Sequence, residues 1–195
     1  MSTRFLRNVL ILMLISASLA CSLFASVAEP SEADMEKEEQ AVYAVFVRDS
    51  KGPAVILQNT STGNLEEDPK QILENLKESL QGISKEAINS YAERNVQQTQ
   101  LSSDMQLGVD YVLLSSEELA EISSQGNWNE ILQERYPGSN GYFIFSRVGF
   151  NNALDQAVVY VGNVAGPLMG AGYYYLLEKQ NGEWNIKEEI MVWIS

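Results

Sequence analysis

Histidine is absent from this 195-residue chain, and cysteine occurs once, at Cys21. Without histidine the chain cannot build a Ser-His or Cys-His nucleophile pair, nor a metal site with histidine ligands. With a single cysteine it cannot close an internal disulfide. The stability of the folded chain must therefore come from its core.

The N-terminal apolar run is too short for a comfortable membrane span, which needs ~20 residues. It covers the 12 residues Val9 to Ala20 and follows a head that carries Arg4 and Arg7 but no acid. A short basic head, an apolar core and small residues are typical of an export signal. Reading on to Ala28 lengthens the run to 20 residues, which leaves an uncleaved anchor as an alternative.

Cys21 closes this apolar run. The stretch SLAC, Ser18 to Cys21, resembles the lipobox of bacterial lipoproteins, in which small residues precede a cysteine that is acylated and becomes the new N-terminus. Ser18 departs from that pattern, which usually has leucine there. We expect residues 1–20 to be an export or lipoprotein signal and Cys21 to be the lipid attachment site. Ordinary signal cleavage after Ala28 is the rival interpretation.

Basic residues are scarce. Without residues 1–20, 11 basic residues stand against 26 acidic ones, a net charge of −15. Such a surface repels phosphate backbones, so we expect no nucleic acid partner. Direct electrostatic adhesion to anionic lipid is also disfavoured. We therefore expect the membrane to be reached through an N-terminal lipid anchor.

The remaining 175 residues suffice for one ordinary domain. We expect an acidic tether over 21–34 and a single α+β domain over 35–195. Apolar spacing and capping residues predict helices at about 33–48, at 69–81, at 85–95, and two short ones within 115–137. Glu39 falls on the apolar stripe of the first helix. Short apolar runs predict strands at 54–62 and 110–116.

Four β-rich runs fill the last third, at 141–148, 156–162, 172–179 and 184–194. Asn181-Gly182 predicts a two-residue type I′ hairpin turn between the last two. Short connections favour an antiparallel meander. The predicted fold class is thus α+β, with N-terminal helices packed on a mainly antiparallel sheet that ends in a four-strand C-terminal meander. Trp184 and Trp193, nine residues apart, should face opposite sides of the sheet.

Few motifs suggest chemistry. The glycines around GPLMGAG precede a strand where a phosphate loop would precede a helix, so a hairpin loop is favoured. Acidic pairs occur at Glu117-Glu118 and Glu188-Glu189, but neighbouring acids in a strand point to opposite faces, and acids at a helix start complement its dipole. We therefore assign no catalytic residue, no metal ligand and no cofactor.

Arg147 stands in the run YFIFSRV, whose other residues are mostly apolar. It could bind a carboxylate ligand. A buried guanidinium without a partner is costly, however, and the chain has an excess of acids. We expect Arg147 to be held by an Asp or Glu of the same domain.

The stretches YPGSNGYFIFSRVGFN, QAVVYVG, GAGYYYLLEK and GEWNIKEEIMVWIS together resemble a group of uncharacterised bacterial secreted or lipoprotein sequences. The resemblance covers about residues 128–195 and implies a shared fold, but no activity. We expect an exported, membrane-anchored domain of the bacterial cell envelope, facing outside the cytoplasm, that acts as a binding or assembly module, with an envelope protein as a possible partner. The alternative is a carboxylate-dependent hydrolase acting on envelope glycan. The absence of histidine and the scattered acids favour binding over catalysis.

Overall fold

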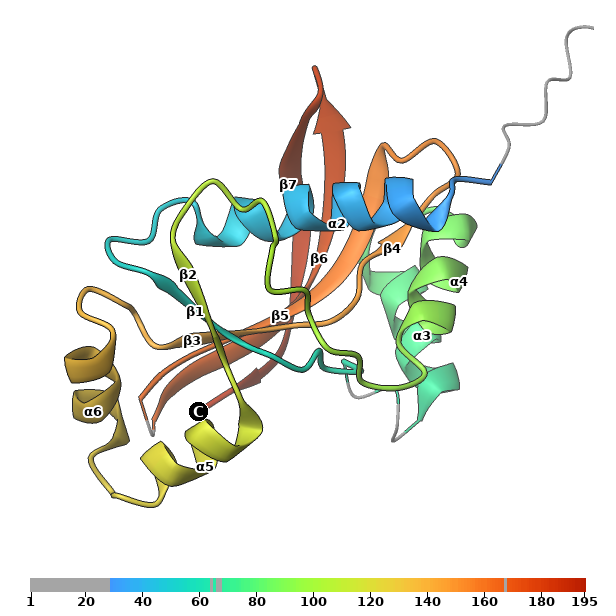
Figure 1. The fold of residues 1–195 in the computed structure, drawn as a ribbon. Coiled ribbons are helices and arrows are strands. Elements are labelled where there is room, and N and C mark those ends of the chain that lie inside the picture. The colour runs from blue at the N-terminus through green and yellow to red at the C-terminus, as the bar shows by residue number, and fades with distance from the viewer. Residues whose placement is uncertain (1–28, 64, 66–67, 167) are drawn as a thin grey trace, which may run out of the picture.

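A computed structural model describes residues 29–63, 65, 68–166 and 168–195. Helices and strands are labelled in Figure 1. The helices are α2 (Glu32–Val47), α3 (Pro69–Ser79), α4 (Lys85–Arg94), α5 (Ser116–Ser123) and α6 (Trp128–Arg135). The strands are β1 (Ala54–Leu57), β2 (Tyr111–Leu114), β3 (Tyr142–Phe145), β4 (Gly149–Phe150), β5 (Gln156–Gly166), β6 (Met169–Gln180) and β7 (Glu183–Ile194).

The strands form one mixed sheet in the order β2-β1-β3-β5-β6-β7, with β4 paired to β5 off this path. β1 runs parallel to β2 and β3, and all other pairs are antiparallel. β3, β5, β6 and β7 are thus the predicted C-terminal meander. The α+β class with a mostly antiparallel sheet is confirmed.

Helix starts follow the capping residues of the sequence. The side chains of Ser31, Asp68, Ser84 and Ser115 each accept a hydrogen bond from a backbone N–H in the first turn of the helix that follows. Ser115 and Glu118 form a reciprocal capping box, because Glu118 also accepts from the backbone N–H of Ser115. These caps satisfy N–H groups that have no partner inside the helix.

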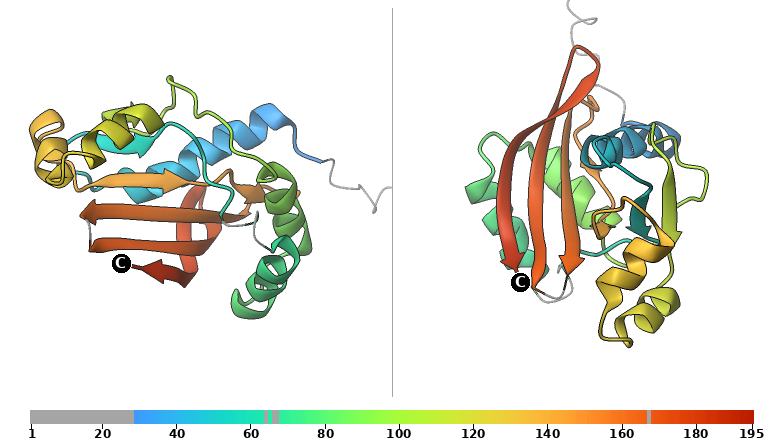
Figure 2. Two further views of the ribbon diagram at one scale, coloured as in Figure 1. Left: turned by 90° about the horizontal axis from the view of Figure 1, so that it is seen from below. Right: turned by 90° about the vertical axis from the view of Figure 1, so that its left-hand side faces the viewer.

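Helices cover both faces of the sheet (Figure 2). α2 packs on one face, where Val42, Tyr43 and Val47 meet Val159 and Leu177 in the largest buried cluster. On the other face, α3 and α4 cover the half of the sheet formed by β5 and β6. α5 and α6 pack against β1 and β2 through a third cluster. The sequence predicted that helices cover one face, and the second layer of helices corrects this. Consecutive residues of β5, whose side chains point to opposite faces, are buried, so both faces of the sheet are covered.

β7 is one edge strand of the sheet and β2 is the other (Figure 2). Asn181 and Gly182 both have positive φ, at 53° and 84°, as the predicted type I′ turn requires. Two register shifts interrupt the pairing of β6 with β7. Each shift inserts one extra residue into β7, so the second shift restores the alternation of faces that the first one inverts, and the tryptophans do face opposite sides. Trp184 donates to Glu38 of α2, and Trp193 donates to the Tyr160 hydroxyl on the other face.

Several element boundaries differ from the sequence expectation. β5 runs to Gly166 and β6 begins at Met169, so most of the loop expected between them is strand. α2 begins at Glu32, so its first turn lies in the segment expected to be tether. β1 ends at Leu57, because the polar residues that follow form isolated bridges instead of a continuous ladder. The run expected as one strand over 141–148 leaves the sheet after Phe145 and returns as β4, which was not predicted.

Candidate functional site

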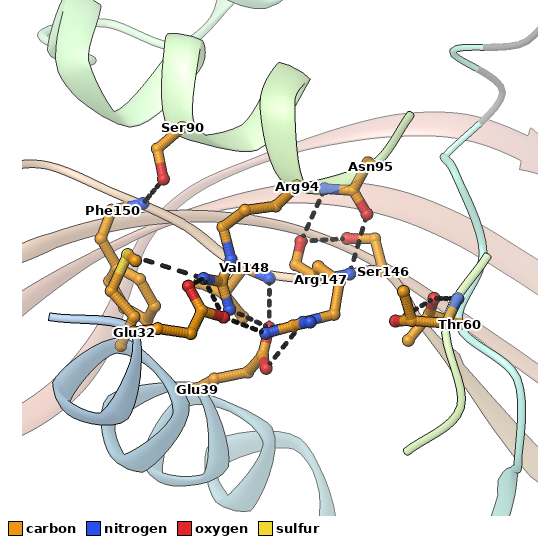
Figure 3. A network of polar contacts seen from close by, with 12 residues as sticks. Glu32, Glu39, Thr60, Ser90, Arg94, Asn95, Ser146, Arg147, Val148 and Phe150 are labelled. Atoms are coloured by element: carbon orange, nitrogen blue, oxygen red, sulfur yellow. Dashed lines mark hydrogen bonds and ion pairs between the residues drawn. The ribbon is translucent and has the colours of Figure 1, made fainter. Parts of the chain in front are cut away.

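The segment between β3 and β4, Ser146 to Val148, contains Arg147, for which the sequence predicts an acidic partner. Figure 3 shows that α2, α4 and this segment meet in one network of polar contacts. Before this segment, β3 pairs with β5, and after it, β4 pairs with β5. The segment brings the Arg147 side chain to α2.

Arg147 is bound by two acids of α2. Its Nε lies 2.9 Å from each carboxylate oxygen of Glu39, and its Nη2 lies 3.0 Å from Oε1 of Glu32. The side chains of Arg147 and Glu39 are 17% and 8% exposed. The sequence expectation for Arg147 is therefore confirmed: an acid of the same domain holds it. Its charge is not free for a ligand.

A second arginine joins this network from α4. Arg94 Nη1 donates to both oxygens of Glu32, at 2.9 and 2.8 Å, and Arg94 Nη2 lies 3.4 Å from Glu39. Two guanidinium groups thus share two carboxylates, and the charges balance. Glu39 also accepts from the backbone N–H of Val148 at 2.7 Å. Its carboxylate is fully engaged, although it sits on the apolar stripe of α2.

The backbone of the same segment is equally occupied. The Tyr43 hydroxyl donates to the Ser146 carbonyl, and Asn95 exchanges two hydrogen bonds with the backbone of Arg147. Phe150 N–H donates to Ser90 of α4. A Cβ on Gly149 would lie 2.4 Å from the backbone nitrogen of Tyr91, so only glycine lets β4 approach α4. Nearly every group in this stretch thus joins two helices to the sheet.

Electrostatics agree with this structural role. Burial by itself would lower the pKa of Arg147, but the Glu39 carboxylate outweighs it, and the pKa lies above its usual value. Burial, reinforced by Glu39, raises the pKa of Tyr43 well above 10. Both groups therefore hold their ordinary protonation states at neutral pH, and neither is poised for proton transfer.

The other sequence candidates lie apart. Cys21 is outside the described residues. The glycine-rich stretch forms the β5–β6 hairpin, as expected. Glu118 caps α5; the Ser115 backbone and hydroxyl lower its pKa. Glu188 accepts from the Gln81 backbone, whereas Glu189 lies opposite Tyr175, so the two acids do face different sides.

Within the described ranges, no cluster of three or more His, Cys, Asp or Glu side chains could hold a metal ion. Over the same residues, no helix is both long and apolar enough to cross a membrane.

An apolar hollow of about 560 Å³ opens where α2 stops covering the sheet. Phe46, in the last turn of α2, forms one wall and lies 4.8 Å from Tyr175, centroid to centroid. Phe143 of β3 and Tyr173 of β6 continue this aromatic surface. The β5–β6 hairpin and the end of β7 complete the hollow with Leu168, Met169, Gly170, Ala171, Ile194 and Ser195, beside Val161 and Asn163 of β5.

Large apolar side chains at the rim of this hollow are open to solvent. Leu168 is 82% exposed, Ile194 71% and Met169 59%. Met191, 51% exposed, lies opposite Tyr173 in the β6–β7 ladder and extends the same surface. Four of the seven exposed large apolar residues in the described chain thus gather here. A concentration of this kind is typical of an interaction site.

The lining contains no charged side chain. Burial, followed by Glu189 and Tyr173, raises the pKa of the Tyr175 hydroxyl to about 12. A smaller, polar hollow of about 360 Å³ contains the carboxylates of Glu36, Glu39 and Asp104. There Glu39 is neutralised by Arg147, and Asp104 accepts from the Ser102 hydroxyl. The apolar hollow is therefore the better candidate, and its chemistry suits binding.

Sequence reasoning missed this hollow. Leu168 and Met169 are visible as apolar residues within a turn, which is where exposure is expected. Nothing in the local pattern, however, indicates that α2 ends before covering them. Comparisons with protein-family models, with curated proteins and with solved structures found no match. The resemblance to bacterial lipoproteins thus stays a prediction.

Proposed function

We propose that this protein is an exported lipoprotein, tethered through Cys21 to a membrane of the bacterial cell envelope, whose domain binds a partner through the apolar hollow beside α2. The single observation that carries the proposal is that four exposed apolar side chains gather around the aromatic floor of the hollow, which is formed by Phe143, Tyr173 and Tyr175. The four are Leu168, Met169, Met191 and Ile194. Apolar cores with aromatic side chains and Met, and without charge, are typical of protein interfaces.

Binding is favoured over catalysis by the state of the acids. The most buried carboxylate among the described residues, Glu39, is shared by two guanidinium groups and a backbone N–H. A glycosidase needs two carboxyl groups facing one open site, about 5–9.5 Å apart, with one able to donate a proton. A carboxylate held by two arginines is a poor proton donor. Glu39 is therefore unsuited to be the acid of a hydrolase pair in the polar hollow.

Membrane tethering is tested by fractionation of a bacterial host that expresses the full chain, with mass spectrometry of the mature protein. The expected product begins at Cys21, carries acyl mass and sediments with membranes, whereas Cys21→Ala loses the acyl mass. A soluble product that begins at Glu29 would refute the tether.

Partner binding is tested with a photo-crosslinking amino acid placed at Met169 in the same cells. The control position is Val96, which is 75% exposed but lies after α4 and does not line the hollow. We expect adducts from position 169 that are absent from position 96. Equal labelling at both positions would show that the hollow has no special contact.

A further inference from the structure

We infer that the occupant of the hollow is an apolar segment of another envelope protein that carries lysine or arginine beside its apolar anchor residues. This inference deepens the proposed function and rests on it. It is drawn from the position of the hollow relative to the tether, from the polarity of its lining, and from the charge around it.

The hollow lies far from the point where the tether enters the domain. α2 begins at Glu32 and ends at Val47, and its 16 residues are about 24 Å long at 1.5 Å per residue. Phe46, at the far end, forms a wall of the hollow. In Figure 1, the start of α2 and the C-terminal end of β7 lie on opposite sides of the molecule. In a domain anchored through its N-terminus, the hollow thus lies at the end remote from the anchored end of α2.

The lining selects a polypeptide over a glycan. A sugar exposes hydroxyl groups on every edge, and each loses a hydrogen bond if it is buried without a polar partner. Besides the tyrosine hydroxyls, the lining offers the side chains of only Asn163 and Ser195 as polar partners. Flexible Leu and Met side chains around an aromatic floor instead suit a large apolar side chain of a protein.

Charge selects a cationic segment. Glu189 borders the hollow, because it pairs with Tyr175 across the ladder and raises the pKa of that tyrosine. Among the described residues Glu189 has no salt-bridge partner. The chain beyond residue 20 carries a net charge of −15. A positively charged segment is attracted by both, whereas a second copy of this acidic domain is repelled.

The open edge of β7 is a less suitable docking place than the hollow. A partner strand added to an edge needs a regular row of free N–H and C=O groups. Register shifts at two places distort β7, and charged residues stand in its middle, at Lys187, Glu188 and Glu189. Bulges and charges of this kind hinder edge-to-edge pairing. The segment is therefore expected to bind the face of the sheet.

The test is a selection from a displayed library of random 12-residue peptides against the full chain reconstituted in phosphatidylcholine nanodiscs. The enriched peptides should combine Trp, Phe, Leu or Met with Lys or Arg. Binding of the best peptide should weaken at least tenfold in Leu168→Ser and in Ile194→Ser. The control Val96→Ser, an equally exposed apolar position away from the hollow, should bind like the parent.

The contribution of charge to peptide binding is tested by two matched variants on β7. Glu189→Gln should weaken binding about threefold and reduce its salt dependence, because a charge pair near the surface is screened by salt. Glu183→Gln, which removes an exposed acid at the other end of β7, should leave affinity unchanged. Enrichment of acidic peptides, or equal binding by the hollow variants and the parent, would overturn the inference.

Three further outcomes would assign a different occupant. Tighter binding to nanodiscs with phosphatidylglycerol through Leu168 would indicate a lipid surface. Binding of peptidoglycan fragments lost in Ile194→Ser would indicate glycan, and dimers lost in the same variant a second copy. The absence of any enriched peptide also overturns the inference. The fractionation test of the lipid anchor is independent of all these results. A protein without the anchor can therefore be distinguished from an anchored protein that does not prefer cationic apolar peptides.

Discussion

Replacing Arg147 by methionine tests whether the network between α2, α4 and the β3–β4 segment is structural. Methionine keeps an unbranched stem, although a shorter one, and removes the charge and the donors. Removing one member of a buried ion pair typically costs ~3–5 kcal/mol, because the other charge is left buried. Here Glu39 keeps Arg94 at 3.4 Å and the Val148 N–H at 2.7 Å. We therefore expect a loss near the lower end, ~3 kcal/mol.

The reverse change should cost more. Glu39→Gln leaves two guanidinium groups, with side chains 9% and 17% exposed, that share only Glu32. Glu32 is itself 57% exposed, so its attraction is screened by solvent. The expected loss for Glu39→Gln lies toward ~5 kcal/mol. Glu39→Gln should thus destabilise the protein more than Arg147→Met does.

Urea unfolding followed by tryptophan fluorescence measures both losses. A loss of ~3 kcal/mol corresponds to about 6–12 °C in melting temperature for a domain of this size. The matched control is Arg135→Met, since Arg135 pairs with Glu121 at the surface, where the side chains are 36% and 62% exposed. Its cost should stay below ~1 kcal/mol. If Arg147→Met also stayed within ~0.5 kcal/mol of the parent, the structural role would be refuted.

The remaining predictions concern packing and pH. Truncation before Gly182 removes β7 and its buried Trp184, so the cooperative thermal transition should be lost; circular dichroism would show a retained transition if β7 were dispensable. Gly149→Ala should destabilise the protein strongly in urea, because the added Cβ meets the α4 backbone at 2.4 Å, whereas Gly166→Ala meets only the flexible end of Met169 at 3.0 Å and should be mild. Burial raises the pKa of Tyr174 and of Tyr175 to about 12, so the contribution of these two tyrosines to stability should be constant up to pH ~10 and fall between pH 10 and 12, because the same tyrosines ionise first in the unfolded chain. Ionisation of all nine tyrosines near pH 10 without unfolding would contradict this burial.

The elements best predicted from the sequence are those with a local chemical signal. Ser84 and Asp68 mark helix starts because their side chains accept first-turn N–H groups. Asn181-Gly182 marks the β6–β7 hairpin because both residues tolerate positive φ. Each signal is complete within a few residues, so no knowledge of the rest of the fold is needed.

Features that depend on distant partners were not predictable. β1 lies between β2 and β3, yet its four apolar residues say nothing about which strands they pair with. Glu39 was visible as an acid on an apolar stripe, and Arg147 as a cation in an apolar run. Their pairing spans 108 positions of sequence, and only the fold brings them together.

The contact network and the hollow lie toward opposite ends of α2, which links the two. Glu32 and Glu39 fix the N-terminal half of the helix through arginines, and its C-terminal half packs by apolar contacts, with Phe46 against Tyr175. A helix held at its first half by ion pairs keeps its last turn in a defined position, because α-helices are stiff over 24 Å. The wall that Phe46 provides is therefore set by groups far from the hollow. The network around Arg147 can thus serve the candidate site without touching it.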